Sequence, residues 1–147
     1  MTSFSDFIGS FTKIEPLSNF QILDICRHIK LNNFRGVFMR DQLNSIHSKQ
    51  DEHCLILNLD LSTNEGTHWT CLFVTKDKCI YFDPFGFCPT PEVEEYCRKI
   101  ENRIYSTFPI QKANSVICGH YCIYVLYKLI NCGEDLFTIT DELYNTV

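Results

Sequence analysis

The sequence lacks a basic excess and a long hydrophobic run, and each absence excludes a class of protein. Its 147 residues carry 13 Lys and Arg against 18 Asp and Glu, a formal net charge of −5. This balance argues against nucleic-acid binding through a basic surface. No apolar stretch approaches the ~20 residues of a membrane-spanning helix. The N-terminus has no basic segment followed by an apolar run, so we expect an intracellular protein without a membrane partner.

The nine cysteines include no CxxC pair, and we therefore expect no zinc site and no other metal. An odd number of cysteines without a secretory signal predicts reduced thiols rather than a disulfide framework. Several lie inside apolar runs, where free cysteine packs as a small hydrophobe. Core packing is thus the default interpretation for eight of the nine.

The length suits one domain, residues 1–147. We predict an extended lead-in over 1–17 and a core over 18–132. Ser18 and Gln21 have the spacing of a capping box, which predicts a helix from Ser18 to about Asn32. The segment 34–38 contains a glycine and is predicted to be an ordered loop.

Strand-like runs cover the middle of the chain. They are predicted at 53–60, 68–75, 79–83 and 103–108, with a tight turn between the second and the third. A helix is predicted from Thr90 to about Asn102, with Pro91 at its first position. The segment 119–130 is apolar nearly all round, as in a buried helix, and one more short helix is expected in 134–147. The fold class is therefore α+β: a mixed, mostly antiparallel sheet with a central buried helix.

The buried helix is predicted to begin at Cys118-Gly119. A thiol at a helix N-terminus lies at the positive end of the helix dipole and near free N–H groups, which favours the thiolate. Gly119 would let a substrate backbone approach closely. Core packing is the alternative for Cys118, and its neighbours decide between the two.

His68 opens the first strand of the predicted hairpin and Asp83 ends the second. If the chain turns at Lys76-Asp77, the numbers of paired residues sum to 153, and His68 and Asp83 become diagonal neighbours on one face. A carboxylate beside an imidazole fixes its tautomer and stabilises its charged form. The same parity turns Cys71 away from His68, so these two make a poor metal site. The alternatives are a histidine in a polar rim and a turn-forming aspartate.

These motifs resemble those of a known family. GTHW (66–69), YFDPFG (81–86), Gln111 and NSVICGHYC (114–122) resemble the adenovirus-type, or adenain-like, cysteine proteases. That family shares a papain-like core with the SUMO- and ubiquitin-like-protein proteases and has relatives in virus-like transposons and other DNA viruses. The segment NFRGVFMRDQL (33–43) is similar to an N-terminal segment of the virus-like members.

The resemblance implies a thiol endopeptidase. Cys118 would be the nucleophile, His68 the general base and Asp83 the group that orients it. Gln111 would donate its amide to the oxyanion, although alone it would be taken for a surface residue. Trp69 would shield the pair and shape the cleft, with a plain core tryptophan equally open.

The resemblance also implies substrates and partners. We expect cleavage near Gly or small residues of viral or virus-like capsid precursors, in the host nucleus or cytoplasm and in the virion. No cofactor is required for the chemistry. A peptide activator is possible, with Cys97 as the nearest candidate for its disulfide, and DNA is doubtful because the chain is acidic. The alternatives are a protease of ubiquitin-like modifiers and a catalytically dead, protein-binding relative.

Overall fold

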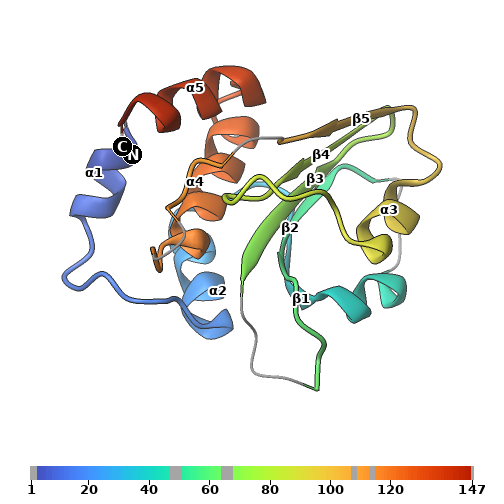
Figure 1. Ribbon diagram of the computed structural model, residues 1–147, viewed down its shortest axis with the longest axis horizontal. Coiled ribbons are helices and arrows are strands. Elements are labelled where there is room, and N and C mark those ends of the chain that lie inside the picture. Colours follow the sequence, from blue (N-terminus) through green and yellow to red (C-terminus); the bar gives the residue numbers. More distant parts are fainter. Residues whose placement is uncertain (1–2, 47–50, 64–67, 107–108, 113–114, 147) are drawn as a thin grey trace.

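The computed structural model describes residues 3–46, 51–63, 68–106, 109–112 and 115–146. Five strands form one sheet in the order β1-β2-β3-β4-β5 (Figure 1). The strands are β1 (Phe34–Met39), β2 (His53–Asn58), β3 (Trp69–Val74), β4 (Lys78–Phe82) and β5 (Asn102–Tyr105). The helices are α1 (Phe4–Gly9), α2 (Asn19–His28), the 3-10 helix η1 (Arg40–Ser45), α3 (Pro91–Cys97), α4 (Cys118–Ile130) and α5 (Leu136–Thr146).

The sheet is mixed, with two parallel and two antiparallel strand pairs. β2, β3 and β4 are antiparallel, whereas the two edge strands run parallel to their neighbours. The predicted α+β class with a mixed sheet and a buried helix is confirmed, but antiparallel pairs are not the majority. A parallel pair needs a crossover rather than a tight turn. Here η1 lies between β1 and β2, and α3 between β4 and β5.

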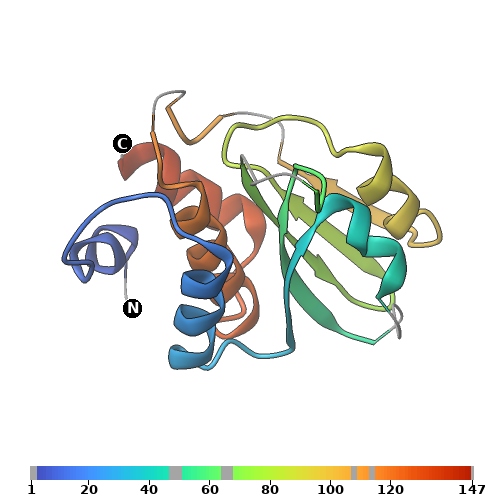
Figure 2. The same cartoon turned by 90° about the horizontal axis from the view of Figure 1, so that it is seen from below.

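Helices cover both faces of the sheet, so that it lies between two helical layers (Figure 2). One face packs on α1, α2, α4 and α5, and the other on η1 and α3. Successive residues of β3 alternate between the two cores: Cys71 and Phe73 face α4, and Leu72 and Val74 face α3. Every residue of β2 and β3 is therefore buried.

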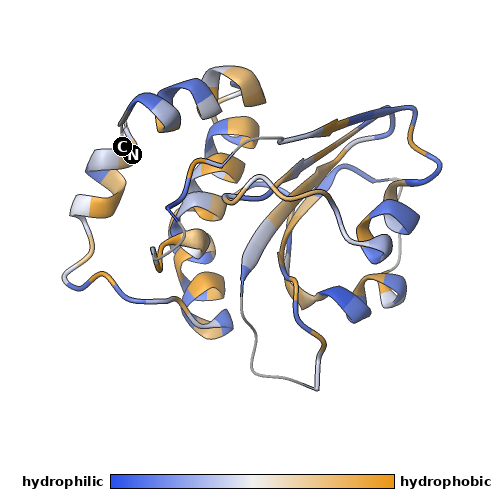
Figure 3. Ribbon diagram, in the orientation of Figure 1, coloured by the Kyte–Doolittle hydropathy of each residue, from blue (hydrophilic) through white to orange (hydrophobic). Residues whose placement is uncertain are grey.

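The predicted central helix is confirmed as α4, which packs on β3. Nine of its 13 residues are buried, and hydrophobic residues follow it along its length (Figure 3). The predicted capping box also forms, since the Ser18 hydroxyl accepts from the Gln21 N–H at 3.2 Å and the Gln21 side chain accepts from the Ser18 N–H at 2.8 Å. The short C-terminal helix is present as α5.

The register of the β3–β4 hairpin is confirmed. Cys71 pairs with Phe82 and Val74 with Cys79, which are the pairs that sum to 153. The turn closes where it was predicted, because the Thr75 N–H donates to the Lys78 carbonyl at 2.7 Å. All residues of the hairpin therefore lie on the predicted faces.

The prediction of an extended lead-in over 1–17 was wrong for the first part of that segment. Residues 4–9 form α1, capped by the Ser3 hydroxyl, which accepts from the Asp6 N–H at 3.1 Å. Phe4 stacks on Tyr121 of α4 with ring centroids 4.4 Å apart. Tertiary packing thus stabilises a helix of six residues that is too short to show a period and too short to be stable alone.

Two further boundaries differ from the predictions. The segment 34–38, predicted as a loop, belongs to β1. Gly36 has φ +130 and lies where the pairing of β1 with β2 is interrupted between Phe34 and Val37, so the glycine marks a bulge and not a loop. α3 ends at Cys97 rather than near Asn102, which already belongs to β5. The end of the strand predicted at 103–108 lies outside the described residues.

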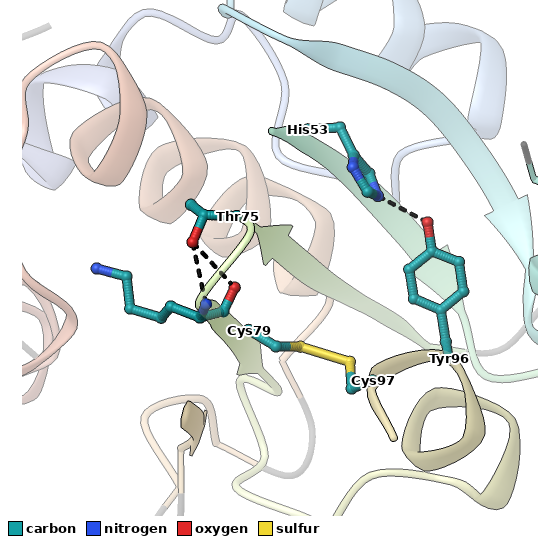
Figure 4. The surroundings of a disulfide bond; sticks show 6 residues. His53, Thr75, Cys79, Tyr96 and Cys97 are labelled. Carbon is teal, nitrogen blue, oxygen red and sulfur yellow. Dashed lines mark hydrogen bonds between the residues drawn. A yellow bond between two sulfur atoms is a disulfide. The ribbon is translucent and has the colours of Figure 1, made fainter. Parts of the chain in front are cut away.

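The prediction of wholly reduced thiols was also wrong. Cys79 of β4 and Cys97 of α3 form a disulfide on the α3 side of the sheet, beside the hydrogen-bonded pair His53–Tyr96 (Figure 4). The two Cα atoms are 6.5 Å apart because α3 packs directly over β4. Seven cysteines are free. Among the described residues, no helix is long and apolar enough to cross a membrane.

Candidate active site

The predicted contact between His68 and Asp83 is present. His68 Nε2 lies 2.6 Å from Asp83 Oδ1, within hydrogen-bonding distance. His68 immediately precedes β3 and Asp83 immediately follows β4. The confirmed register of the hairpin therefore brings the two side chains to one face, at the end of the sheet opposite the turn.

Asp83 is fully buried, and its surroundings hold it in place. Its Oδ1 also accepts from the Phe85 N–H at 2.8 Å. The backbone is held by Ser106, whose hydroxyl accepts from the Asp83 N–H at 2.9 Å and donates to the Asp83 carbonyl at 3.3 Å. Within the described part of the chain, His68 is the only side chain that forms an ion pair with Asp83, so its proton neutralises a charge that has no access to water.

The Phe85 and Ser106 contacts were not predicted as parts of the site. Phe85 stacks on His68 with ring centroids 4.3 Å apart and an angle of 20° between the planes. The register did place Phe85 opposite His68, so the signal was available in the sequence. No local pattern distinguishes Ser106, which reaches Asp83 only because β5 pairs with β4.

Cys118 is the first residue of α4 and is partly exposed. Ile117, the preceding residue, offers no side-chain cap to this helix, so it supplies no hydrogen-bond acceptor to the first-turn N–H groups. Cys118 lies close enough to His68 to raise the pKa of the imidazole. Because Nε2 of His68 faces Asp83, Nδ1 is the nitrogen left to exchange a proton with the thiol.

Burial shifts the pKa of His68 in one direction, and Asp83 and Cys118 shift it in the other. Burial lowers it, but the hydrogen bonds and charges of Asp83 and Cys118 outweigh burial and raise it to about 9. His68 is therefore mostly protonated at neutral pH. An imidazolium next to a thiol stabilises the thiolate form of that thiol, which is the reactive nucleophile.

Trp69 and Gly119, the two residues predicted to bind substrate, make close contacts inside the protein. Trp69 is buried, and its indole N–H donates to the Leu17 carbonyl at 2.9 Å. A Cβ at position 119 would lie 3.3 Å from Trp69 Cδ1 and 3.4 Å from Ile22 Cδ1. The glycine thus allows a close approach inside the protein, and both residues fix the first turn of α4 against α2 and β3.

Gln111 is buried and lies on the segment that leads to α4. Its N–H donates to the Pro84 carbonyl at 2.9 Å, which ties the segment to the loop after Asp83. Its side-chain Nε2 donates to the Ser115 carbonyl at 2.9 Å. Nε2 carries two hydrogens, so this bond leaves one for an oxyanion. The structure thus brings Gln111 beside the loop that follows Asp83.

The other candidates lie apart from this cluster. Cys71 belongs to the core on the α4 side, as the parity predicted. His120 is fully buried against Phe11, with ring centroids 4.7 Å apart. Cys97 is bonded to Cys79, so it is not available to an activating peptide while that bond stands. The residues that the structure describes contain no group of three potential ligands that could hold a metal. Parts of the GTHW and NSVICGHYC motifs lie outside the described residues.

A partly exposed cysteine at a helix start, close to a histidine that a buried aspartate holds, is the arrangement expected of a Cys–His–Asp triad. The sequence comparison finds a protease. A protease of bovine adenovirus 2 is 28% identical over 114 residues, which make up 67% of this chain and 55% of that protein. No family model matches the chain. The resemblance to adenovirus-type proteases is confirmed, and the chain spans about half the length of the relative.

Solved structures support the fold. The ASFV protease superposes with a TM-score of 0.61 and 18% identity, over 88% of this chain and 65% of that one. A structure of AvrA superposes with a TM-score of 0.51 and 14% identity, over 97% of this chain and 62% of that one. The chain therefore has the α+β fold of the ASFV protease.

Proposed function

We propose that this chain is a thiol endopeptidase in which Cys118 attacks the peptide bond. The observation that supports this most strongly is the buried His68–Asp83 pair at 2.6 Å, with Cys118 close enough to raise the pKa of the same imidazole. Burial normally disfavours a charged carboxylate and a charged imidazole. A fold that keeps both beside a partly exposed thiol has the features of a catalytic site.

In the first half of the reaction, the Cys118 thiolate adds to the carbonyl carbon of the scissile bond. The negative charge that develops on the carbonyl oxygen is stabilised by the Cys118 N–H and, in our proposal, by the second Nε2 hydrogen of Gln111. When the tetrahedral intermediate collapses, the C–N bond breaks and His68 Nδ1 gives its proton to the leaving amine.

In the second half, neutral His68 takes a proton from water and the resulting hydroxide attacks the thioester. The C–S bond breaks, the acid product leaves, and Cys118 returns as thiolate beside the imidazolium. Asp83 stays ionised throughout, holding the tautomer and stabilising the positive charge on His68.

The physiological role is proposed from the sequence resemblance. Capsid precursors of a virus or a virus-like element, cut near Gly or other small residues, are the substrates that we expect. Any strong activator would be a peptide or protein. DNA alone should stimulate little, since the net charge of −5 disfavours phosphate binding. Cleavage of a Gly-Gly-linked modifier in place of a capsid precursor would instead support the modifier protease.

The decisive test compares thiol reactivity with exposure. Cys88 and Cys132 are exposed free thiols, whereas Cys118 is only partly exposed. If exposure alone governed alkylation, Cys88 and Cys132 would react first. We expect limiting iodoacetamide at pH 7 to modify Cys118 first, because an adjacent histidine activates a catalytic cysteine as a nucleophile. Mass spectrometry of the digested protein gives the order of reaction.

Unmodified enzyme then tests turnover. Candidate precursor proteins are incubated with the wild type, with Cys118→Ala and, as a matched control, with Cys88→Ala. New termini should appear with the wild type and the control alone. Equal labelling of all exposed thiols together with the absence of new termini would instead support the dead, protein-binding relative.

A further inference from the structure

An apolar groove opens beside the proposed site. It has a volume of about 710 Å³ and is lined mainly by Phe85, Phe87, Pro109, Gln111, Lys112 and Tyr144. A second depression of about 360 Å³ continues it along α5, sharing Pro109 and Tyr144 and adding Phe137. The groove thus runs from the loop after β4, past the 109–112 segment, to the surface of α5.

The groove collects large aromatic side chains that face water. Phe87 is 62% exposed, Tyr144 61% and Phe137 79%. Phe87 also packs against Phe85, with ring centroids 5.9 Å apart. Three such residues along one connected depression form an apolar surface of the kind that marks a binding site in a soluble protein.

The position of the groove relative to His68 identifies the occupant. Phe85 both lines the groove and stacks on the His68 ring, and Gln111 lines the same groove. In the proposed mechanism His68 protonates the leaving amine, so the amine departs on the side of the site where Phe85 lies. A partner that remained in this groove would block the departing segment, which favours the substrate itself as occupant.

We infer that this groove binds the substrate segment that follows the scissile bond, and that it selects bulky apolar or aromatic side chains there. The inference rests on the proposed peptidase function and extends it from the reacting bond to specificity on the leaving side. Phe87 and Tyr144 would supply most of the contact, and Phe137 would extend it for longer substrates.

The test uses three reporter substrates. They have the same residues before the scissile bond and differ only after it. The first releases a small fluorogenic amine and has no leaving-side residues. The second and third are internally quenched peptides that continue with Phe-Leu or with Ser-Ser. We expect kcat/KM to be at least about tenfold higher for the Phe-Leu peptide than for the Ser-Ser peptide, since burying one or two apolar side chains provides that much discrimination.

Variants assign the preference to the groove. Phe87→Ser and Tyr144→Ser should reduce the ratio of kcat/KM for the Phe-Leu peptide to that for the amine reporter by about fivefold to tenfold. The matched control is Phe20→Ser on α2, which is 76% exposed and outside the groove, and it should keep the wild-type ratio.

Equal kcat/KM values for the two peptides, or an unchanged ratio in both groove variants, would overturn the inference while leaving the peptidase intact. Absence of hydrolysis of all three reporters, combined with unselective labelling of Cys118, would overturn the proposed function and the groove's role with it.

Discussion

Asp83→Asn removes the negative charge that holds the proton on His68 while keeping the shape of the side chain. In the wild type the pKa of His68 is raised from 6.5 to about 9 against the effect of burial. At about 1.4 kcal/mol per pKa unit, the net preference of the site for imidazolium is about 3 kcal/mol. The Asn variant retains burial but loses the carboxylate, and an adjacent opposite charge is worth about 1–3 pKa units. The pKa of His68 should therefore fall to between about 6 and 8.

This shift has two observable consequences. The plot of kcat/KM against pH should lose activity on its alkaline side near pH 9 in the wild type, where His68 loses the proton that it gives to the leaving amine. In Asp83→Asn the same limb should move below pH 8. The maximal rate should also fall, by up to about 10⁴-fold, because an amide can hold the ring but cannot stabilise its charge.

Stability follows the same titration. The folded pKa of His68 lies above the unfolded value, so this residue stabilises the fold fully below pH 6.5 and loses its contribution as the pH rises through about 9. Urea unfolding at pH 6.5 and 9.5 should show a loss of up to about 3 kcal/mol in the wild type and a smaller loss in Asp83→Asn.

Asp77→Asn is the matched control. Asp77 is exposed at the turn of the same hairpin, and neutralising it makes the same chemical change far from His68. It should leave the alkaline limb near pH 9. If the limb of Asp83→Asn also stays near pH 9, the carboxylate does not hold the proton of His68 and the reasoning is wrong.

Three further substitutions test other parts of the structure. Cys118→Ala should abolish hydrolysis of the amine reporter yet change the free energy of unfolding by less than about 1 kcal/mol, because the thiol is partly exposed; near wild-type turnover would exclude Cys118 as nucleophile. Gln111→Ala should lower kcat by about 10²–10³ with little change in KM; a loss of thermal stability with unchanged kcat would assign Gln111 to packing through its bond to Ser115. His120→Leu should reduce the loss of stability in acid. Burial lowers the pKa of His120 to about 4, below its unfolded value. The free energy of unfolding of the wild type therefore falls by up to about 3 kcal/mol between pH 6.5 and pH 4. Urea midpoints at pH 7.5 and pH 5 measure that slope, and an unchanged slope in the variant would contradict the assignment to His120.

The parts that sequence reasoning predicted best depend on periodicity. The parity of the β3–β4 hairpin, with a two-residue turn, fixed the faces of His68 and Asp83 correctly. The apolar run from Gly119 to Ile130 and the capping box at Ser18 are local signals of the same kind. In each case the physical determinant lies within a few residues of the feature that it sets.

The parts that failed depend on contacts between distant segments. α1 forms because Phe4 packs on Tyr121, and nothing within residues 4–9 reveals this partner. β1 was hidden by Gly36, whose positive φ is used inside a strand at a bulge. The Cys79–Cys97 bond depends on α3 crossing over β4, and its cysteines are 18 positions apart with no signal in their spacing.

The hairpin also limits how the chain can change length. Its turn at Lys76-Asp77 lies about 20 Å from the His68–Asp83 pair at ~3.4 Å per residue, yet it determines whether the two side chains share a face. A residue inserted at the tip can be taken up as a longer loop, because hairpins also close with loops of three to five residues. A one-residue slip of the pairing would instead exchange the two faces of β4 and turn Asp83 away from His68. Among natural relatives, length differences in this hairpin should therefore be confined to the tip.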